Sequence, residues 1–150
     1  MRILNCWLAL GLVAALAAAA VAGEKPSAEY AAAMRTLEAA ARGLGEALDA
    51  RDHGTMNEHV IRARPAIELV QQYWRDREGD GDQVRDAVDA IRAVSKSVSE
   101  ISVAVHLMTL SPNPLAVEGA EIALTNLHAA CATCHAAYRE QQPDGGYLIR

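Results

Sequence analysis

The chain has 150 residues, with 14 Lys and Arg against 19 Asp and Glu, so its formal net charge is −5. This length suits one domain with its own hydrophobic core. The acidic balance, without a run of basic residues, argues against a nucleic-acid-binding surface, because phosphate binding needs clustered Lys and Arg. The mixture of polar and apolar residues after residue 23 excludes a multi-span membrane protein. Abundant Ala, Leu, Glu and Arg favour helix.

The first 22 residues have the features of a secretory signal peptide. Arg2 precedes an uncharged apolar stretch over residues 3–21, and Ala20-Val21-Ala22 is a small-x-small cleavage motif. We therefore expect an exported, periplasmic protein whose mature domain is 23–150. Removing Arg2 and no acidic residue lowers its net charge from −5 to −6. The alternative interpretation is a retained amino-terminal anchor, because the apolar stretch approaches the length that spans a bilayer.

Two amphipathic helices are predicted in the first half of the mature domain. Ser27 is a plausible N-cap for the first, and Thr55–Glu58 has the form of a capping box for the second. Pro65 predicts a kink near Arg64 or a new turn there. The helical period of 3.6 places two sets of residues on apolar stripes: Tyr30, Met34, Leu37, Ala41, Leu44 and Leu48, then Met56, Val60, Ala63, Ile67, Val70 and Trp74.

Two more helices are predicted after an acidic loop over residues 76–82. The third carries an apolar stripe of Val84, Val88, Ile91, Val94, Val98, Ile101, Val105 and Met108. Asn113 and Pro114 suit the N-cap and first position of the fourth, which is expected from about 115 to 142, before Pro143. Four helices with short connections predict an all-α fold, an antiparallel up-down four-helix bundle.

The fourth predicted helix carries the string Cys131-Ala132-Thr133-Cys134-His135. This Cys-x-x-Cys-His pattern is the attachment signature of c-type haem. On a helix, Cys131 and Cys134 lie on one side, so both sulfurs can reach the two vinyl groups of one porphyrin. His135 points to the same side and can ligate the iron. The sequence therefore predicts one covalently bound haem c near one end of the bundle.

Other interpretations of the two cysteines remain open. A thioredoxin-type redox pair needs a βαβ setting, and the pattern predicts no strands. A zinc site needs further ligands, and His128 is the residue at hand to join Cys131, Cys134 and His135. A plain disulfide, which export favours, leaves His135 without a role.

A carboxy-terminal Cys-x-x-Cys-His on the last helix of a domain of this size, continuing as Ala136-Ala137-Tyr138-Arg139, resembles the class II c-type cytochromes, cytochrome c′ and its low-spin relatives. The resemblance implies a haem packed between helices, His135 as proximal ligand and homodimerisation through the first two helices. It also implies that Arg139 lies beside the proximal face of the haem. The absence of Phe, the proline at position 65 and the tail 144–150 depart from that pattern.

The sixth iron position decides the function. If the first and last helices are antiparallel neighbours, Met34 lies level with His135, and the low-spin relatives take a Met ligand from the first helix. A His135–Met34 iron is typical of a single-electron carrier that serves redox partner proteins. If Leu37, one turn along the stripe, lies over the iron instead, the site is five-coordinate and binds small gases such as NO and CO.

The remaining His and Met residues have ordinary interpretations. We expect Met56 and Met108 in the core, His53 and His59 near the far end of the bundle, and His106 off the apolar stripe. His128 is expected to be partly exposed, near a haem edge. No distal acid–base pair emerges from the stripe, so we do not expect an enzyme.

Overall fold

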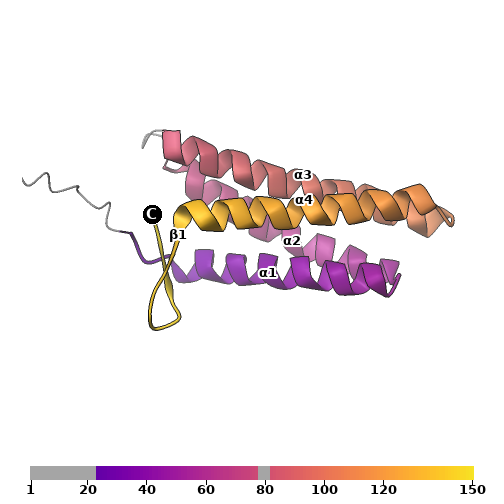
Figure 1. Ribbon diagram of the computed structural model, residues 1–150, viewed down its shortest axis with the longest axis horizontal. Coiled ribbons are helices and arrows are strands. Elements are labelled where there is room, and N and C mark those ends of the chain that lie inside the picture. Colours follow the sequence, from indigo (N-terminus) through magenta and orange to yellow (C-terminus); the bar gives the residue numbers. More distant parts are fainter. Residues whose placement is uncertain (1–22, 78–81) are drawn as a thin grey trace, which may run out of the picture.

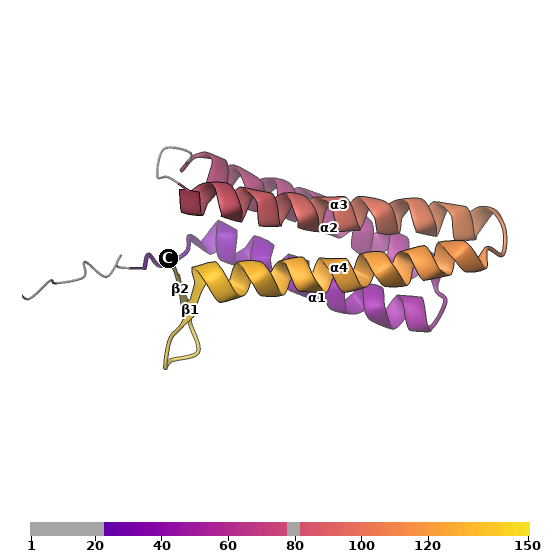
Figure 2. The same ribbon diagram turned by 45° about the horizontal axis from the view of Figure 1, so that its top comes forward.

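The computed structural model describes residues 23–77 and 82–150, and the predicted signal peptide, 1–22, lies outside the described residues. Four helices pack side by side in one bundle (Figure 1; Figure 2). They are α1 (Ala28–Asp49), α2 (His53–Arg75), α3 (Asp82–Leu110) and α4 (Pro114–Tyr138). Helix α1 packs on α2, α2 on α3 and α3 on α4, whereas α1 and α4 touch more sparsely. The four predicted helices and the all-α bundle are confirmed.

Two predicted N-caps are confirmed. The Ser27 hydroxyl accepts a hydrogen bond from the Tyr30 backbone N–H at 3.1 Å, at the start of α1. The Asn113 side chain accepts one from the Ala116 backbone N–H at 3.2 Å, and Pro114 occupies the first turn of α4. These bonds satisfy backbone donors that a helix start leaves without a partner.

The start of α2 corrects the prediction of a capping box over Thr55–Glu58. The N-cap is Asp52, whose carboxylate accepts hydrogen bonds from the Thr55 backbone N–H at 3.0 Å and from the Thr55 hydroxyl at 2.7 Å. The carboxylate of Asp52 reaches this backbone donor, so the helix begins earlier, at His53. Of the two alternatives predicted near Arg64, the new turn is wrong, because α2 runs through Pro65, which is exposed; the kink stays a prediction.

The core follows the predicted stripes. All eight stripe residues of α3 are buried, from Val84 to Met108. Leu44, Met56, Val60, Val88 and Ile101 are among the largest fully enclosed side chains. Burial of this apolar area is the main favourable contribution to folding.

The carboxy-terminal segment differs from the prediction of a helix reaching residue 142. Helix α4 ends at Tyr138, and a hairpin of β1 (Arg139–Gln141) and β2 (Tyr147–Ile149) follows. The strand β2 also pairs with the start of the described chain: the backbone N–H groups of Glu24 and Ile149 each donate to the carbonyl of the other at 2.8 Å. Gly145, at φ +84°, supplies the left-handed turn residue of the hairpin.

Two surface properties of the described residues bear on location and assembly. No helix within 23–77 and 82–150 combines the length and hydropathy needed to span a membrane. Large apolar side chains are exposed mainly on α3 and α4, at Val103, Leu107, Leu110, Leu115 and Ile122, with Ile61 exposed on α2.

Candidate functional site

A cavity of about 560 Å³ lies between α1 and α4. Its volume is in the range of cofactor and small-ligand pockets. Apolar side chains from α2 and α3, including Val70, Ile91 and Val94, also line it. The cavity therefore occurs where the contact between α1 and α4 is sparse, and all four helices contribute to its wall.

The Cys-x-x-Cys-His residues of α4 all line this cavity. Cys131, Cys134 and His135 are each half-buried, and α4 is continuous through them. Their spacing of three and four residues places them on one helix face. The structure thus brings the two thiols and the imidazole together on one wall of an apolar cavity.

The two thiols are protonated groups in this setting. Burial raises the pKa of Cys131, and burial together with the neighbouring Cys131 raises the pKa of Cys134 to about 11. A thioredoxin-type thiol instead has a lowered pKa, so the redox-pair interpretation does not suit these cysteines. Both are free, without the disulfide bond that export alone would favour.

The surroundings of His135 favour the form of imidazole that ligates metals. Burial lowers its pKa, the charge of Arg139 lowers it further, and the carboxylate of Glu38 opposes them. The neutral imidazole is the ligand form. Two thiols, a neutral imidazole and an apolar cavity of this size are what a covalently held haem requires, so the residues present fit that cofactor.

The two candidate distal residues, Met34 and Leu37, also line the cavity, from α1. Met34 additionally lines a second, smaller cavity together with Cys134 and His135, whereas Leu37 lines only the larger one. Helical register predicted that Met34 lies level with His135, and the shared lining of two cavities agrees with that register. Both Met34 and Leu37 are half-buried.

Three of the four remaining histidines lie away from the cavity. His53 is the first residue of α2, His59 packs over Gly43, and His106 is exposed. His128 is exposed but borders the cavity. Met56 and Met108 are buried core residues, as predicted.

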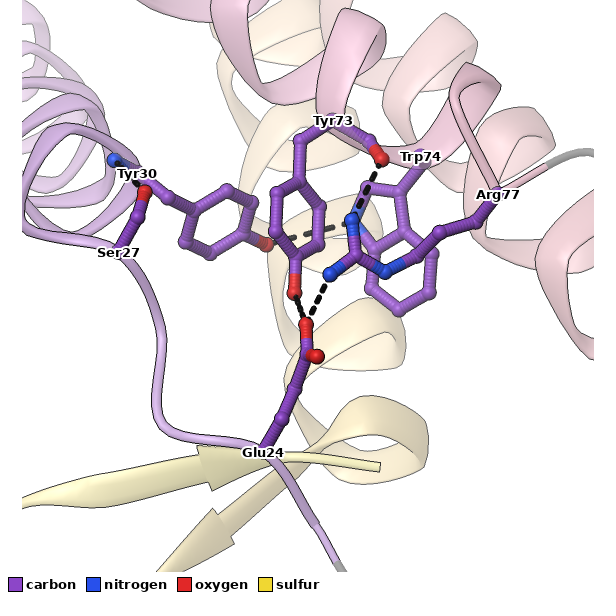
Figure 3. Close-up of polar contacts among 6 residues, drawn as sticks. All are labelled: Glu24, Ser27, Tyr30, Tyr73, Trp74 and Arg77. Carbon is purple, nitrogen blue, oxygen red and sulfur yellow. Dashed lines mark hydrogen bonds and ion pairs between the residues drawn. The ribbon is translucent and has the colours of Figure 1, made fainter.

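Arg139, predicted beside the proximal face, begins β1 and lines the smaller cavity with His135. Tyr30 lines both cavities. The indole N–H of Trp74 donates to the Tyr30 hydroxyl at 3.3 Å, and the Tyr30 and Tyr73 rings lie 4.2 Å apart (Figure 3). Tyr73 and Trp74 thus pack at the cavity end of the bundle.

A charged border of the cavity on α1 was not predicted from the sequence. Glu38, Arg42, Glu46 and Asp49 all line it. The spacing of Glu38, Arg42 and Glu46 at four-residue intervals, beside the apolar stripe, is a signal that could have found them. The tail 144–150 was the other omission, since Tyr147 and Ile149 line the smaller cavity.

Among the described residues, no three His, Cys, Asp or Glu side chains gather as ligands of a metal ion, and this covers the zinc set of His128, Cys131, Cys134 and His135. No family model, no curated protein and no solved structure matches the chain.

Proposed function

We propose that this protein is an exported monohaem c-type cytochrome of the class II kind, an antiparallel up-down four-helix bundle that carries single electrons. One observation carries the proposal. Both thiols and the imidazole of a Cys-x-x-Cys-His string, together with Met34 from another helix, line the same apolar cavity. The resemblance in sequence rests on residues 131–139, and the cavity is an independent property of the fold.

Each residue of the string has a distinct role in the proposal. Cys131 and Cys134 bond to the porphyrin through thioethers, which prevents the cofactor from being lost by dilution. His135 would ligate the iron, and burial lowers its pKa, which favours the neutral imidazole that binds metals. When bound, a haem supplies a one-electron couple at its iron.

Met34 is the proposed sixth ligand. It shares two cavities with His135, and a thioether is an established axial ligand of c-type haem. A filled sixth position suits electron transfer. Leu37 lies in the larger cavity on the same stripe. If Leu37 covers the iron instead, the protein is a five-coordinate binder of NO or CO, and the spectrum described below distinguishes the two.

The proposed partners are redox proteins that dock at the cavity edge. Glu38, Glu46 and Asp49 outnumber Arg42 there, and the mature domain is acidic, which favours partners with a basic surface. No catalytic role is proposed.

The homodimer that the resemblance implies uses α1 and α2. Within the described part of those helices, Ile61 is the exposed large apolar side chain, whereas five such side chains lie on α3 and α4. The distribution of exposed apolar surface therefore does not favour the α1–α2 face.

The test is the mass and optical spectrum of the processed protein, purified after export. We expect a polypeptide that starts at Gly23 and is heavier by one haem, with a sharp α band when reduced and a weak far-red Met–iron band when oxidised. A colourless sample with the mass of the bare polypeptide would overturn the proposal. A high-spin spectrum that shifts with carbon monoxide would replace the carrier with the gas binder.

A further inference from the structure

The carboxy-terminal hairpin closes a second cavity, of about 280 Å³, next to the candidate haem site. The first turns of α1 and the last turn of α4 form its other walls, and Met34, Cys134 and His135 border both cavities. The tail that departs from the family pattern thus helps to build a pocket.

Two polar atoms of residues that line this pocket are buried and have no hydrogen-bond partner. They are Nε of Arg139, in β1, and the hydroxyl oxygen of Tyr147, in β2. The guanidinium carbon of Arg139 lies 4.6 Å from the centre of the Tyr147 ring, so the two groups are neighbours. Both carry a hydrogen that can be donated. Buried donors are costly without acceptors, so an acceptor that enters the pocket and reaches these two groups would relieve that cost.

The charge around the pocket specifies what kind of acceptor fits. Arg35, on α1, also lines it, and its charge and that of Arg139 both oppose the rise that burial causes in the pKa of Tyr147. Glu38 is the carboxylate on the wall. With two guanidinium groups against one carboxylate, the pocket favours an anion. A carboxylate has two acceptor oxygens and can accept hydrogen bonds from a guanidinium and a hydroxyl at the same time.

We propose that Arg35, Arg139 and Tyr147 form a carboxylate-binding site closed by the carboxy-terminal hairpin. Two sources can supply the carboxylate: a propionate of the porphyrin, or a small free carboxylic acid. The site stands on its own residues, and only the porphyrin as source rests on the proposed function.

The hairpin is held in place by contacts outside the site. The Arg150 side chain donates to the Glu140 carboxylate at 3.1 Å, and Ile149 pairs with Glu24. The Glu24 carboxylate in turn accepts hydrogen bonds from Tyr73 and Arg77 on the α2 side of the bundle (Figure 3). These contacts fix Tyr147 over the pocket before any ligand arrives, which reduces the ordering cost of binding.

The test compares thermal melting of the processed protein at pH 7 in sodium acetate and in sodium chloride of equal ionic strength. The variants are Tyr147→Phe, which removes only the hydroxyl, and Arg35→Gln. Arg62→Gln is the matched control, because Arg62 is exposed on α2 with an exposed partner, Glu58. A ligand that binds only the folded state raises the melting temperature.

For a free acid as source, acetate raises the melting temperature of wild type and Arg62→Gln by several degrees, and that rise is lost in Tyr147→Phe and Arg35→Gln. For the porphyrin as source, acetate has no effect on a haem-loaded sample, but Tyr147→Phe melts lower in both salts. The direction of the change in melting temperature on Tyr147→Phe is informative, because the Tyr147 hydroxyl has no hydrogen-bond partner in the protein. Removing a buried hydroxyl without a ligand leaves stability equal or higher.

The proposal is overturned if acetate has no effect and Tyr147→Phe melts at or above wild type. Mass spectrometry of the same sample separates this failure from that of the proposed function. In a sample without haem, an acetate response that needs Tyr147 and Arg35 supports the site although the cytochrome proposal falls. A sample that has no haem and shows no acetate response overturns both the carboxylate site and the cytochrome proposal.

Discussion

The apolar stripe along α4 is fully buried in one half of the bundle and half-buried in the other. In the closed half, its residues are at most 5% exposed: Ala116, Ala120, Ala123 and Leu127. In the cavity half, Cys131, Cys134 and His135 continue the same face but remain half-buried. Helix α1 shows the same change, with Leu44 and Leu48 buried and Met34 and Leu37 half-buried.

The difference shows where side-chain chemistry takes precedence over packing. In the closed half, alanines on α4 allow close approach of its neighbours, and the residues there are ordinary core fillers. In the cavity half, a thioether, two thiols and an imidazole occupy stripe positions around an apolar space. Helical periodicity alone treats both halves alike, so the type of residue, not the period, separates core from site.

The largest effect is expected from removing both thiols of the cavity half. In a Cys131→Ala, Cys134→Ala double variant, we expect no covalent haem, because both attachment points are gone. The measurement is the intact mass and the visible spectrum of the exported protein. Thr133→Ala is the matched control, since Thr133 lies between the two cysteines, is exposed and bonds only to its own helix. A double variant that retains covalently bound colour would contradict the assignment.

A second substitution tests the sixth ligand. Met34→Ala removes the thioether, so we expect a low-spin spectrum to become high-spin and responsive to carbon monoxide. The control is Met108→Leu, which changes a buried core methionine outside the cavity. A spectrum that Met34→Ala leaves unchanged would show that Met34 does not fill the sixth iron position.

The contrast in packing predicts unequal losses of stability. Leu44→Ala should lower the free energy of unfolding by about 2–5 kcal/mol, because it opens a cavity around a fully buried side chain. Leu37→Ala should cost only about 1 kcal/mol, because Leu37 is half-buried on a cavity wall and loses less contact. Urea unfolding of the two variants measures both values. Equal losses of stability in the two variants would contradict the proposed difference between fully buried and half-buried positions of the stripe.

The smallest expected effect concerns the polar contacts that hold the cavity end together. The hydrogen bond from Tyr73, and then the charge of Arg77, lower the pKa of Glu24, against the opposing effect of burial. Because the folded pKa lies below the ordinary value of 4.5, the stabilisation is complete above that pH and is lost as the pH falls through the folded pKa.

Melting of wild type and Glu24→Gln across pH tests this small effect. Their melting temperatures should differ most at pH 7 and converge as the pH falls below 4.5. Glu68→Gln, on the exposed side of α2, is the matched control. A difference between wild type and Glu24→Gln that stays constant with pH would exclude ionised Glu24 as its cause.

The helices could be predicted from the sequence because their signals are local. The stripe of α3 keeps one period over its whole length, and Ser27 and Asn113 each bond to a backbone N–H three residues away. The start of α2 was missed because two good caps, Asp52 and Thr55, compete within three residues. Only the three-dimensional course of the chain decides which carboxylate or hydroxyl reaches the free N–H.

The hairpin could not be predicted in this way. Its strands have three residues each, too short for a periodic signal. The strand that ends at Ile149 also depends on pairing with Glu24, from the opposite end of the described chain. For the site, the motif identified Cys131, Cys134 and His135, and register identified Met34. Tyr147 and the charged border on α1 could not be predicted, because their positions at the cavities depend on which loops and helix faces meet.

The pairing of Glu24 with Ile149 also bears on the order of assembly. Contacts between residues so distant along the chain carry a large loop-closure cost and tend to form late. Neighbouring helices such as α1 and α2 are close in sequence, whereas the pairing of Glu24 with Ile149 joins residues that lie far apart along the chain. We therefore expect the contact of Glu24 with Ile149, at the end of the bundle that holds the cysteines, to form late in folding.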